Sequence, residues 1–362
     1  MLHKNPAQSM IALFGFLFCM ASAAQAQEAA PQKMANVTIL ATGGTIAGTG
    51  ASSTTTVGYT AATVGVQRLI QAVPELAKVA NVSGEQVFQI ASENMTDDHW
   101  LTLAKRVNAL LAQGGVDGIV ITHGTDTLEE TAYFLNLVVK SRKPVVLVGA
   151  MRPSTALSAD GPINLYNAVL LAASPDAVGK GVLVAMNDQI QAARDVSKSN
   201  TSAPDAFRSP DLGMLGYFQG SKAFFYRQVV RKHTVDTEFD VGTLQALPQV
   251  DIVYGHANVG PVAVDAFMAA GSKGIIHAGV GNGSLAAKVK PALISARAKG
   301  AVVVRASRVG QGILARNGEA NDDELDFVAA DTLNAQKARI LLMLALTRTS
   351  STKEIQRMFY TY

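Results

Sequence analysis

The chain has 362 residues, of which 48% are apolar and 16% are charged. This composition excludes an intrinsically disordered chain, and the length favours two domains of about 150–200 residues each. The 31 Lys and Arg residues against 28 Asp and Glu give a formal net charge of +3, which supplies no electrostatic reason for a nucleic-acid partner.

The first residues have the pattern of a secretory signal peptide. Lys4 supplies a positive charge, residues 11–20 are apolar, and residues 24–26 have the small-x-small pattern that precedes a cleavage site. The apolar run is shorter than the roughly 20 residues needed to span a bilayer, which disfavours a membrane anchor. We therefore predict that residues 1–26 are removed and that the mature protein is periplasmic.

The single cysteine, Cys19, lies inside this segment. A lipoprotein signal centred on Cys19 is the alternative, and it is disfavoured because the preceding Phe18 is bulkier than the small residue that such processing requires. Removal of the segment leaves a chain without cysteine. A disulfide and a thiol nucleophile are then both excluded, and the fold depends on its core.

Short β-branched runs alternate with amphipathic stretches in the first half of the mature chain. This order is typical of an α/β domain with a mostly parallel sheet. Thr96 and Gly114-Gly115 are suited to begin and end the first helix. Strands are predicted over 37–41, 118–122, 144–148 and 182–186, and helices over 97–113 and 128–140.

The alternation lapses over residues 227–248, which are polar and crowded with charge, and resumes afterwards. We interpret this stretch as a linker between a larger N-terminal α/β domain, residues 27–226, and a smaller C-terminal α/β domain, residues 249–362, also with a parallel sheet. In the second domain, strands are predicted over 251–254, 274–276 and 301–304, and helices from Pro261, over 286–298 and, last, over a buried segment at 332–347.

Two strand-end loops carry the candidate chemistry, because ligands of open α/β sheets gather at the carboxyl ends of strands. The first loop places Thr45 directly after Gly43-Gly44. It lacks the glycine spacing of a dinucleotide site, and the chain has no phosphate-binding P-loop motif. On its own, this glycine pair favours a plain turn.

The second loop, residues 123–127, places Thr125 and Asp126 at the mouth of the sheet. On spacing alone, Asp126 favours a helix-capping role, and the acidic residues at 129–130 suit the positive end of a helix dipole. His123 is the one candidate base beside Thr125, although its strand-end position favours a structural, hydrogen-bonded role.

The mature sequence lacks the familiar nucleophile and metal patterns. There is no G-x-S-x-G or H-E-x-x-H motif, and the five mature histidines show no metal-ligand spacing. We therefore predict no metal and no cofactor. A threonine nucleophile would need a base other than histidine, such as a buried lysine with a lowered pKa or a tyrosine–carboxylate pair.

Several motifs in order resemble those of the bacterial type II L-asparaginases, and most closely the periplasmic glutaminase-asparaginases of the Pseudomonas type. The resemblance covers residues from about 35 to 362. It implies an amidohydrolase that releases ammonia from L-glutamine and L-asparagine through a threonyl acyl-enzyme. The motifs are Thr42-Gly-Gly-Thr-Ile-Ala47, His123-Gly-Thr-Asp-Thr-Leu-Glu-Glu-Thr131, Val148-Gly-Ala-Met-Arg-Pro-Ser154, Ser158-Ala-Asp-Gly-Pro162, Asn164-Leu-Tyr-Asn167 and Gly279-Val-Gly-Asn-Gly283.

The resemblance implies a first catalytic group around Thr45. Thr45 would be the nucleophile, with the Tyr59 hydroxyl over it and Glu319 supporting that tyrosine. Tyr59 lies in a segment rich in Ser, Thr and Gly, which suits the mobile lid of this family. Without the resemblance, Tyr59 would read as an ordinary exposed loop tyrosine.

A second group implied by the resemblance combines a hydroxyl, an amine and a carboxylate, from Thr125, Lys198 and Asp126. It would lie on the opposite side of the substrate from Thr45. Without the resemblance, Lys198 would read as a solvated surface lysine. Which threonine attacks first stays open at this point.

An amino-acid substrate also needs partners for its α-carboxylate and α-ammonium groups. By resemblance, Ser92 binds the carboxylate, and carboxylates face the ammonium as hydrogen-bonded ion pairs. The family is usually a homotetramer, a dimer of dimers, whose sites lie between subunits and receive two residues from a neighbour's smaller domain. The residues assigned to substrate binding are Ser92, Glu93, Asp126, Ala150 and, from the neighbour, Asn282 and Ser284.

Two positions depart from the asparagine-selective members of the family. Glu93 stands where those enzymes often have Gln, and Ser284 where they often have Asn. A shorter Ser284 side chain leaves room for the extra methylene of glutamine, which is worth only about 1–3 kcal/mol of discrimination. We therefore predict appreciable activity on both amides. The alternatives are an asparagine-selective enzyme, a nucleotide-dependent α/β protein and a non-enzymatic periplasmic amino-acid-binding protein.

Overall fold

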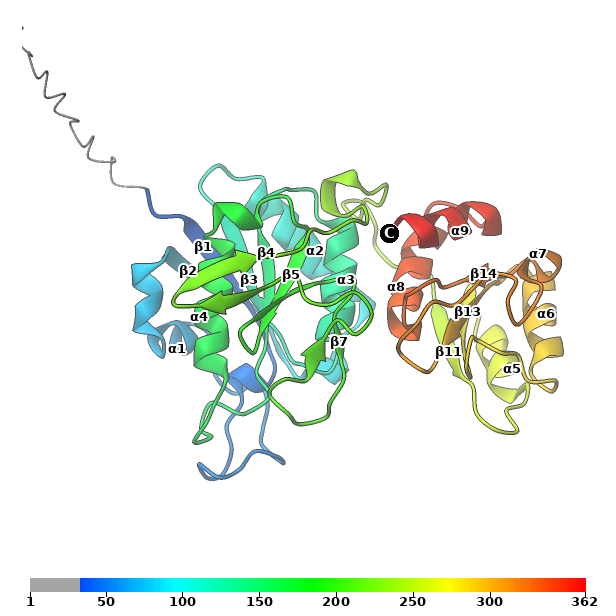
Figure 1. The fold of residues 1–362 in the computed structure, drawn as a ribbon, viewed down its shortest axis with the longest axis horizontal. Helices are drawn as coiled ribbons and strands as arrows, with labels where there is room; N and C mark the ends of the chain where they lie inside the picture. The colour runs from blue at the N-terminus through cyan, green and yellow to red at the C-terminus, as the bar shows by residue number, and fades with distance from the viewer. Residues whose placement is uncertain (1–32) are drawn as a thin grey trace, which may run out of the picture. The chain divides into compact units, whose positions relative to one another are not determined.

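The computed structural model describes residues 33–362 (Figure 1). The predicted signal peptide, residues 1–26, lies outside the described residues. Among the helices of residues 33–362, none is long and apolar enough to cross a membrane.

An eight-stranded sheet forms the centre of the N-terminal part, in the order β10-β9-β6-β5-β4-β3-β1-β2. The five strands from β2 to β5 in this order are parallel, and β6, β9 and β10 add an antiparallel edge. The strands are β1 (Asn36–Gly43), β2 (Asn81–Ile90), β3 (Gly118–Thr122), β4 (Val145–Val148), β5 (Val182–Met186), β6 (Gln189–Ala192), β9 (Gly216–Gln219) and β10 (Lys222–Phe225).

Helices cover both faces of this sheet (Figure 1). Neighbouring strand residues point to opposite faces, so Leu40 of β1 packs in the core with α2 and α3, whereas Ile39 packs in the core with α1 and α4. The central strands of a parallel sheet are buried on both faces, so β3, β4 and β5 are apolar almost throughout, whereas the edge strand β2 is half-exposed. The helices are α1 (Val66–Gln71), α2 (Asp97–Leu111), α3 (Leu128–Val138) and α4 (Gly161–Ala172).

A second, four-stranded sheet forms the C-terminal part, in the order β11-β12-β13-β14, with every pair parallel. One face packs on α5 and α6, and the other on α8 and α9. The elements are β11 (Val250–Tyr254), α5 (Val262–Ala269), β12 (Gly274–Gly279), α6 (Lys290–Ala298), β13 (Val302–Ser307), α7 (Asp322–Leu325), β14 (Val328–Ala329), α8 (Ala335–Leu346) and α9 (Thr352–Thr361).

The predicted fold class, two α/β units with a larger N-terminal and a smaller C-terminal sheet, is confirmed. Thr96 caps α2 as predicted, since its hydroxyl accepts a hydrogen bond from the His99 backbone. The prediction that the helix at 332–347 is the last one is wrong, because α9 follows it. The sequence reading also missed β2, whose half-exposed residues lack a continuous apolar run. The domain boundaries at 226 and 249 stay predictions.

Candidate active site

A cavity of about 540 Å³ opens at the carboxyl ends of β1 and β3. Its walls come from the two strand-end loops, the loop that carries Tyr59, the short 3-10 helix Ser92–Asn94, and the segment after Lys198. The residues that line it are Gly44, Thr45, Thr56, Val57, Gly58, Tyr59, Ala61, Ala91, Ser92, Glu93, Gly124, Thr125, Asp126, Met151, Lys198, Thr201 and Ser202.

Thr45 is placed by the glycine pair that precedes it. Gly44 has a φ of +80°, and a Cβ atom there would lie 2.3 Å from the Gly124 Cα, so only glycine allows the two strand-end loops to meet. Thr45 is buried, and its Oγ1 lies 2.7 Å from the Tyr59 hydroxyl oxygen. The expectation of a plain turn is therefore incomplete, because the turn also aims a hydroxyl into the cavity.

The second group assembles around Lys198, which lies in the two-residue strand β7 (Ser197–Lys198) paired with β8 (Phe207–Arg208). Lys198 Nζ lies 2.9 Å from Thr125 Oγ1 and 2.6 Å from Asp126 Oδ1. The Lys198 side chain is only 16% exposed, against 59% for Asp126. Reading Lys198 as a solvated surface lysine is therefore wrong.

Asp126 does not cap a helix. The N-cap of α3 is Thr127, which makes no side-chain capping bond, and the Asp126 carboxylate accepts a hydrogen bond from Lys198 instead. The preference for capping, based on spacing alone, was wrong because the competing partner lies 72 positions further along the chain.

Ser92 and Glu93 lie beside this group. Ser92 is buried, and its Oγ accepts a 3.2 Å hydrogen bond from the Asp126 backbone N–H, while its carbonyl accepts one of 2.8 Å from the Thr127 hydroxyl. Glu93 is exposed and lines the cavity. A hydroxyl and two carboxylates, those of Glu93 and Asp126, thus face the same space.

Four predicted site residues are not among those that line the cavity. Ala150 is fully buried, and its neighbour Met151 reaches the cavity wall instead. Asn282 and Ser284 lie in the loop after β12, where Asn282 Oδ1 accepts a 3.0 Å hydrogen bond from the Ala315 backbone. Glu319 is exposed in the segment between β13 and α7. Within residues 33–362, no hydrogen bond joins Glu319 to Tyr59.

His123 is a structural residue, as its position suggested. The imidazole is fully buried, with Nδ1 2.7 Å from the Gly124 carbonyl and Nε2 2.9 Å from Thr131 Oγ1. Burial lowers the pKa of His123 to about 4, so the ring is neutral at pH 7. Across the part of the chain that the structure describes, His, Asp and Glu side chains form no cluster of three that would hold a metal ion.

Sequence reasoning missed some of the cavity wall. Met151, Thr201 and Ser202 line the cavity. The signal for Thr201 and Ser202 was their position shortly after Lys198, in a run of small polar residues. Met151 lies one residue beyond the predicted Ala150, near the start of the loop between β4 and α4.

Two family models match almost the whole described chain: "Asparaginase, N-terminal" over residues 36–231 and "Glutaminase/Asparaginase C-terminal domain" over residues 249–359. The chain belongs to the asparaginase family. The resemblance inferred from the motifs is thereby confirmed, and so is the class of enzyme, a hydrolase of linear amides.

Relatives of the asparaginase family match over most of their length. A glutaminase-asparaginase of Pseudomonas fluorescens biotype A is 56% identical over 342 residues, 94% of each chain. A probable periplasmic L-asparaginase of Haemophilus influenzae is 50% identical over 351 residues, 97% of each chain. The crystal structure of a probable cytoplasmic L-asparaginase from Campylobacter jejuni has a TM-score of 0.89 and 52% identity, covering 91% of this chain and all of that one.

Proposed function

We propose that the protein hydrolyses the side-chain amides of L-glutamine and L-asparagine, giving L-glutamate, L-aspartate and ammonia. The observation that carries the proposal is the pair of threonine hydroxyls in one cavity, each with its own partner. Thr45 has the Tyr59 hydroxyl at 2.7 Å, and Thr125 has the Lys198 amine at 2.9 Å. Two activated hydroxyls suit an amide, which is a poor electrophile.

In the first half-reaction, Thr45 Oγ1 attacks the amide carbon and its proton passes to the Tyr59 oxygen beside it, while the Tyr59 hydroxyl releases its own proton toward the amide nitrogen. The C–N bond then breaks, and the nitrogen takes up a proton and leaves as ammonia. The product is an ester between Thr45 and the acyl group. Backbone N–H groups of the two glycine-flanked turns stabilise the oxyanion.

The second half-reaction uses water. The Thr125 and Lys198 pair lies in the same cavity and accepts a proton from the attacking water, and Thr45 leaves with a proton returned to it. Asp126, at 2.6 Å, balances the positive charge that Lys198 acquires when it takes up this proton.

Substrate binding follows from the polar groups that remain. Ser92 and nearby backbone N–H groups bind the α-carboxylate, and the exposed carboxylates of Glu93 and Asp126 bind the α-ammonium. Both substrates carry the same two charged groups, and they differ by one methylene. A cavity of about 540 Å³ accommodates either amide.

We propose that the site is completed by a second subunit in a homotetramer. Asn282 and Ser284 belong to one loop, and the 3.0 Å hydrogen bond between the Ala315 N–H and Asn282 ties the Glu319 segment to that loop. If Asn282 and Ser284 come from a neighbour, Glu319 therefore comes with them and supports the partner's Tyr59. The mass of the assembly, measured by light scattering, tests the tetramer.

Ammonia release from the two amides tests the function. We expect turnover of both by the purified protein, and loss of turnover in Thr45→Ala and Thr125→Ala. A glutamine kcat/KM thousands of times below that for asparagine would support the asparagine-selective alternative. Binding without turnover, unchanged in Thr45→Ala, would instead identify an amino-acid-binding protein.

We also propose a periplasmic location after removal of residues 1–26. The relatives include one named periplasmic and one named cytoplasmic, so the name of a relative does not decide the question. Amino-terminal sequencing of the protein purified from its native cell tests whether residues 1–26 are removed. A mature chain that begins at Gln27 supports the proposal, and an intact Met1 contradicts it.

A further inference from the structure

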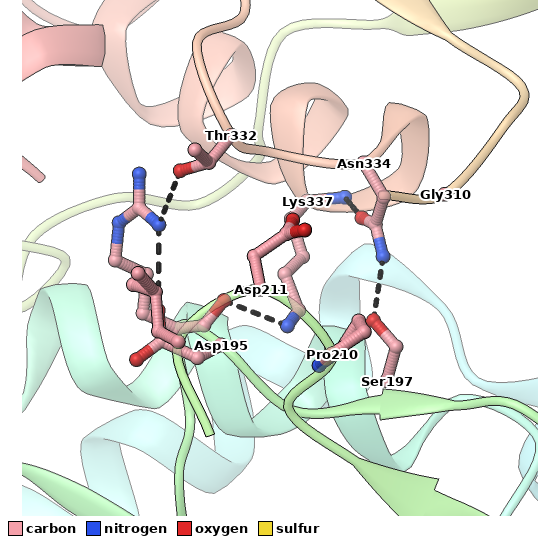
Figure 2. A pocket seen from close by; sticks show the side chains of 10 residues that line it. Asp195, Ser197, Pro210, Asp211, Gly310, Thr332, Asn334 and Lys337 are labelled. Atoms are coloured by element: carbon pink, nitrogen blue, oxygen red, sulfur yellow. Dashed lines mark hydrogen bonds and ion pairs between the residues drawn. The ribbon is translucent and has the colours of Figure 1, made fainter. Parts of the chain in front are cut away.

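A buried polar cluster joins α3, β7 and α8, outside the cavity that holds the proposed chemistry. Figure 2 shows Lys337 and Asn334 of the C-terminal part pointing toward the segment around Ser197. Lys337 is only 1% exposed, and its ammonium group donates hydrogen bonds to the backbone carbonyls of Arg194, at 2.8 Å, and Val196. A lysine side chain from α8 thus holds the backbone immediately before Lys198.

Glu129 connects this cluster to the active-site loops. It lies in the first turn of α3, three positions after Asp126, and is only 5% exposed. Its carboxylate accepts hydrogen bonds from Asn334 Nδ2 at 2.9 Å and from the Lys198 backbone N–H at 3.4 Å, and it lies 3.9 Å from Lys337 Nζ. One carboxylate therefore joins the helix after Asp126 to the strand that carries Lys198.

Asn334 is the third member of the cluster and has two functions. Its Oδ1 accepts a 3.0 Å hydrogen bond from the Lys337 backbone and caps α8. Its Nδ2 donates a hydrogen bond to the Glu129 carboxylate. The same Nδ2 also donates, at 3.0 Å, to Ser197 Oγ in β7, as Figure 2 shows. The capping bond and the two bonds to other elements use different atoms, so they can be separated by substitution.

The chemistry of the cluster is poorly explained by stability alone. Burial lowers the pKa of Lys337 to about 8, which reports the cost of placing an ammonium group away from water. Buried ion pairs often give no more stability than apolar residues of similar volume. What they do provide is directional bonding, and β7 needs it because this two-residue strand pairs only with the two residues of β8.

We propose that Glu129, Asn334 and Lys337 are positioning residues, which fix β7 so that Lys198 Nζ lies against Thr125 and Asp126. The inference rests on the proposed function, in which Lys198 takes part in proton transfer. It extends that function, because the cavity of the proposed active site is lined only by residues of the N-terminal part. The helix α8, in the C-terminal part, then helps to determine the geometry of that site.

The first test is Asn334→Ser. Serine retains an oxygen that caps α8 but cannot donate to Glu129 and Ser197 at the same time. We expect kcat for both amides to fall by about tenfold while KM stays within twofold, because displacements near 1 Å cost up to about a hundredfold in rate. Ser351→Ala is the matched control, since it removes the cap of the neighbouring helix α9 and lowers the unfolding midpoint without reaching β7.

The second test removes both charges at once. Glu129→Gln/Lys337→Met leaves no lone buried charge, so we expect it to fold, which circular dichroism checks. It should reproduce the low kcat with a KM near that of the unsubstituted protein. If both this variant and Asn334→Ser retain full kcat, the positioning role is refuted.

A double-mutant cycle separates this inference from the proposed function. If Asn334 acts through Lys198, adding Asn334→Ser to Lys198→Ala lowers kcat no further. A further tenfold loss in that background would overturn the inference. If Lys198→Ala alone retains full kcat, the proposed function fails and the inference falls with it. If Lys198→Ala abolishes turnover but Asn334→Ser does not affect it, only the inference fails.

Discussion

The buried imidazole of His123 makes the stability of the protein depend on acid in a predictable way. The pKa of His123 is lowered to about 4 from 6.5 because the ring is fully buried. As the pH falls below 6.5, the unfolded chain takes up a proton at this position and the folded chain does not. The free energy of unfolding therefore falls, and this contribution levels off below about pH 4.

The size of this effect follows from the two pKa values. They differ by about 2.5 pH units, and one unit corresponds to about 1.4 kcal/mol, so His123 alone removes about 3 kcal/mol between pH 6.5 and 4. His277, whose pKa burial also lowers to about 4, acts in the same direction. Glu130 acts in the opposite direction, because burial raises its pKa to about 7 and the folded state then holds the extra proton.

His123→Asn isolates the contribution of His123. Asparagine can still donate to the Gly124 carbonyl, but it does not titrate, and the Thr131 hydroxyl loses its ring partner. We expect the variant to be less stable by about 1–3 kcal/mol at pH 7.5, and to lose less stability than the unsubstituted protein as the pH falls to 4.5.

Urea unfolding at fixed protein concentration provides the measurement. The single tryptophan, Trp100, donates a 2.8 Å hydrogen bond to Thr131, so its fluorescence reports on the same buried chain of bonds. His256→Asn, at an exposed histidine, is the control. If His123→Asn shows the same loss of unfolding free energy between pH 6.5 and 4.5 as the unsubstituted protein, the reasoning is refuted.

Three further predictions concern the active site. Tyr59→Phe removes the hydroxyl at 2.7 Å from Thr45, and we expect kcat for ammonia release to fall by about 10²–10⁴ with little change in KM. Gly44→Ala places a Cβ atom 2.3 Å from backbone of the facing loop, so thermal unfolding should occur at a lower temperature and turnover should be lost. Mixed oligomers of Thr45→Ala and Glu319→Ala subunits should recover part of the activity, measured on the co-expressed protein, because some sites then combine two unsubstituted halves.

Each of these has a control or a contradicting outcome. Full kcat in Tyr59→Phe would exclude its hydroxyl from proton transfer. Gly58→Ala has a similar positive φ of +71° but open space around its Cβ, so it should be affected far less than Gly44→Ala. Mixed oligomers of Thr45→Ala and Lys198→Ala should stay inactive, because both residues line the same cavity of one chain. Equal recovery in both mixtures would contradict a site shared between subunits.

Part of the order of strands and helices was predictable from the sequence, because hydrophobic periodicity and helix caps are local signals. The run at 118–122 is β3, and the prediction over 128–140 contains α3. Thr96 caps α2 as expected, since a cap and its partner lie within one helical turn. The motif around Thr45 and Thr125 also identified the family from the sequence alone.

The partners of the polar side chains were decided by the tertiary structure. Asp126 and Glu129 both had adequate local explanations, as a cap and as a favourable charge at a helix terminus. In the folded chain Asp126 bonds to Lys198, and Glu129 bonds to Asn334, 205 positions away. Spacing along the chain describes only neighbours within a turn or two, whereas burial and hydrogen bonding depend on which distant segments the sheets bring together. The sequence by itself therefore determined the family and most of the parallel strands of the larger sheet, and the packing of α8 and β7 against α3 determined the environment of the residues proposed to act.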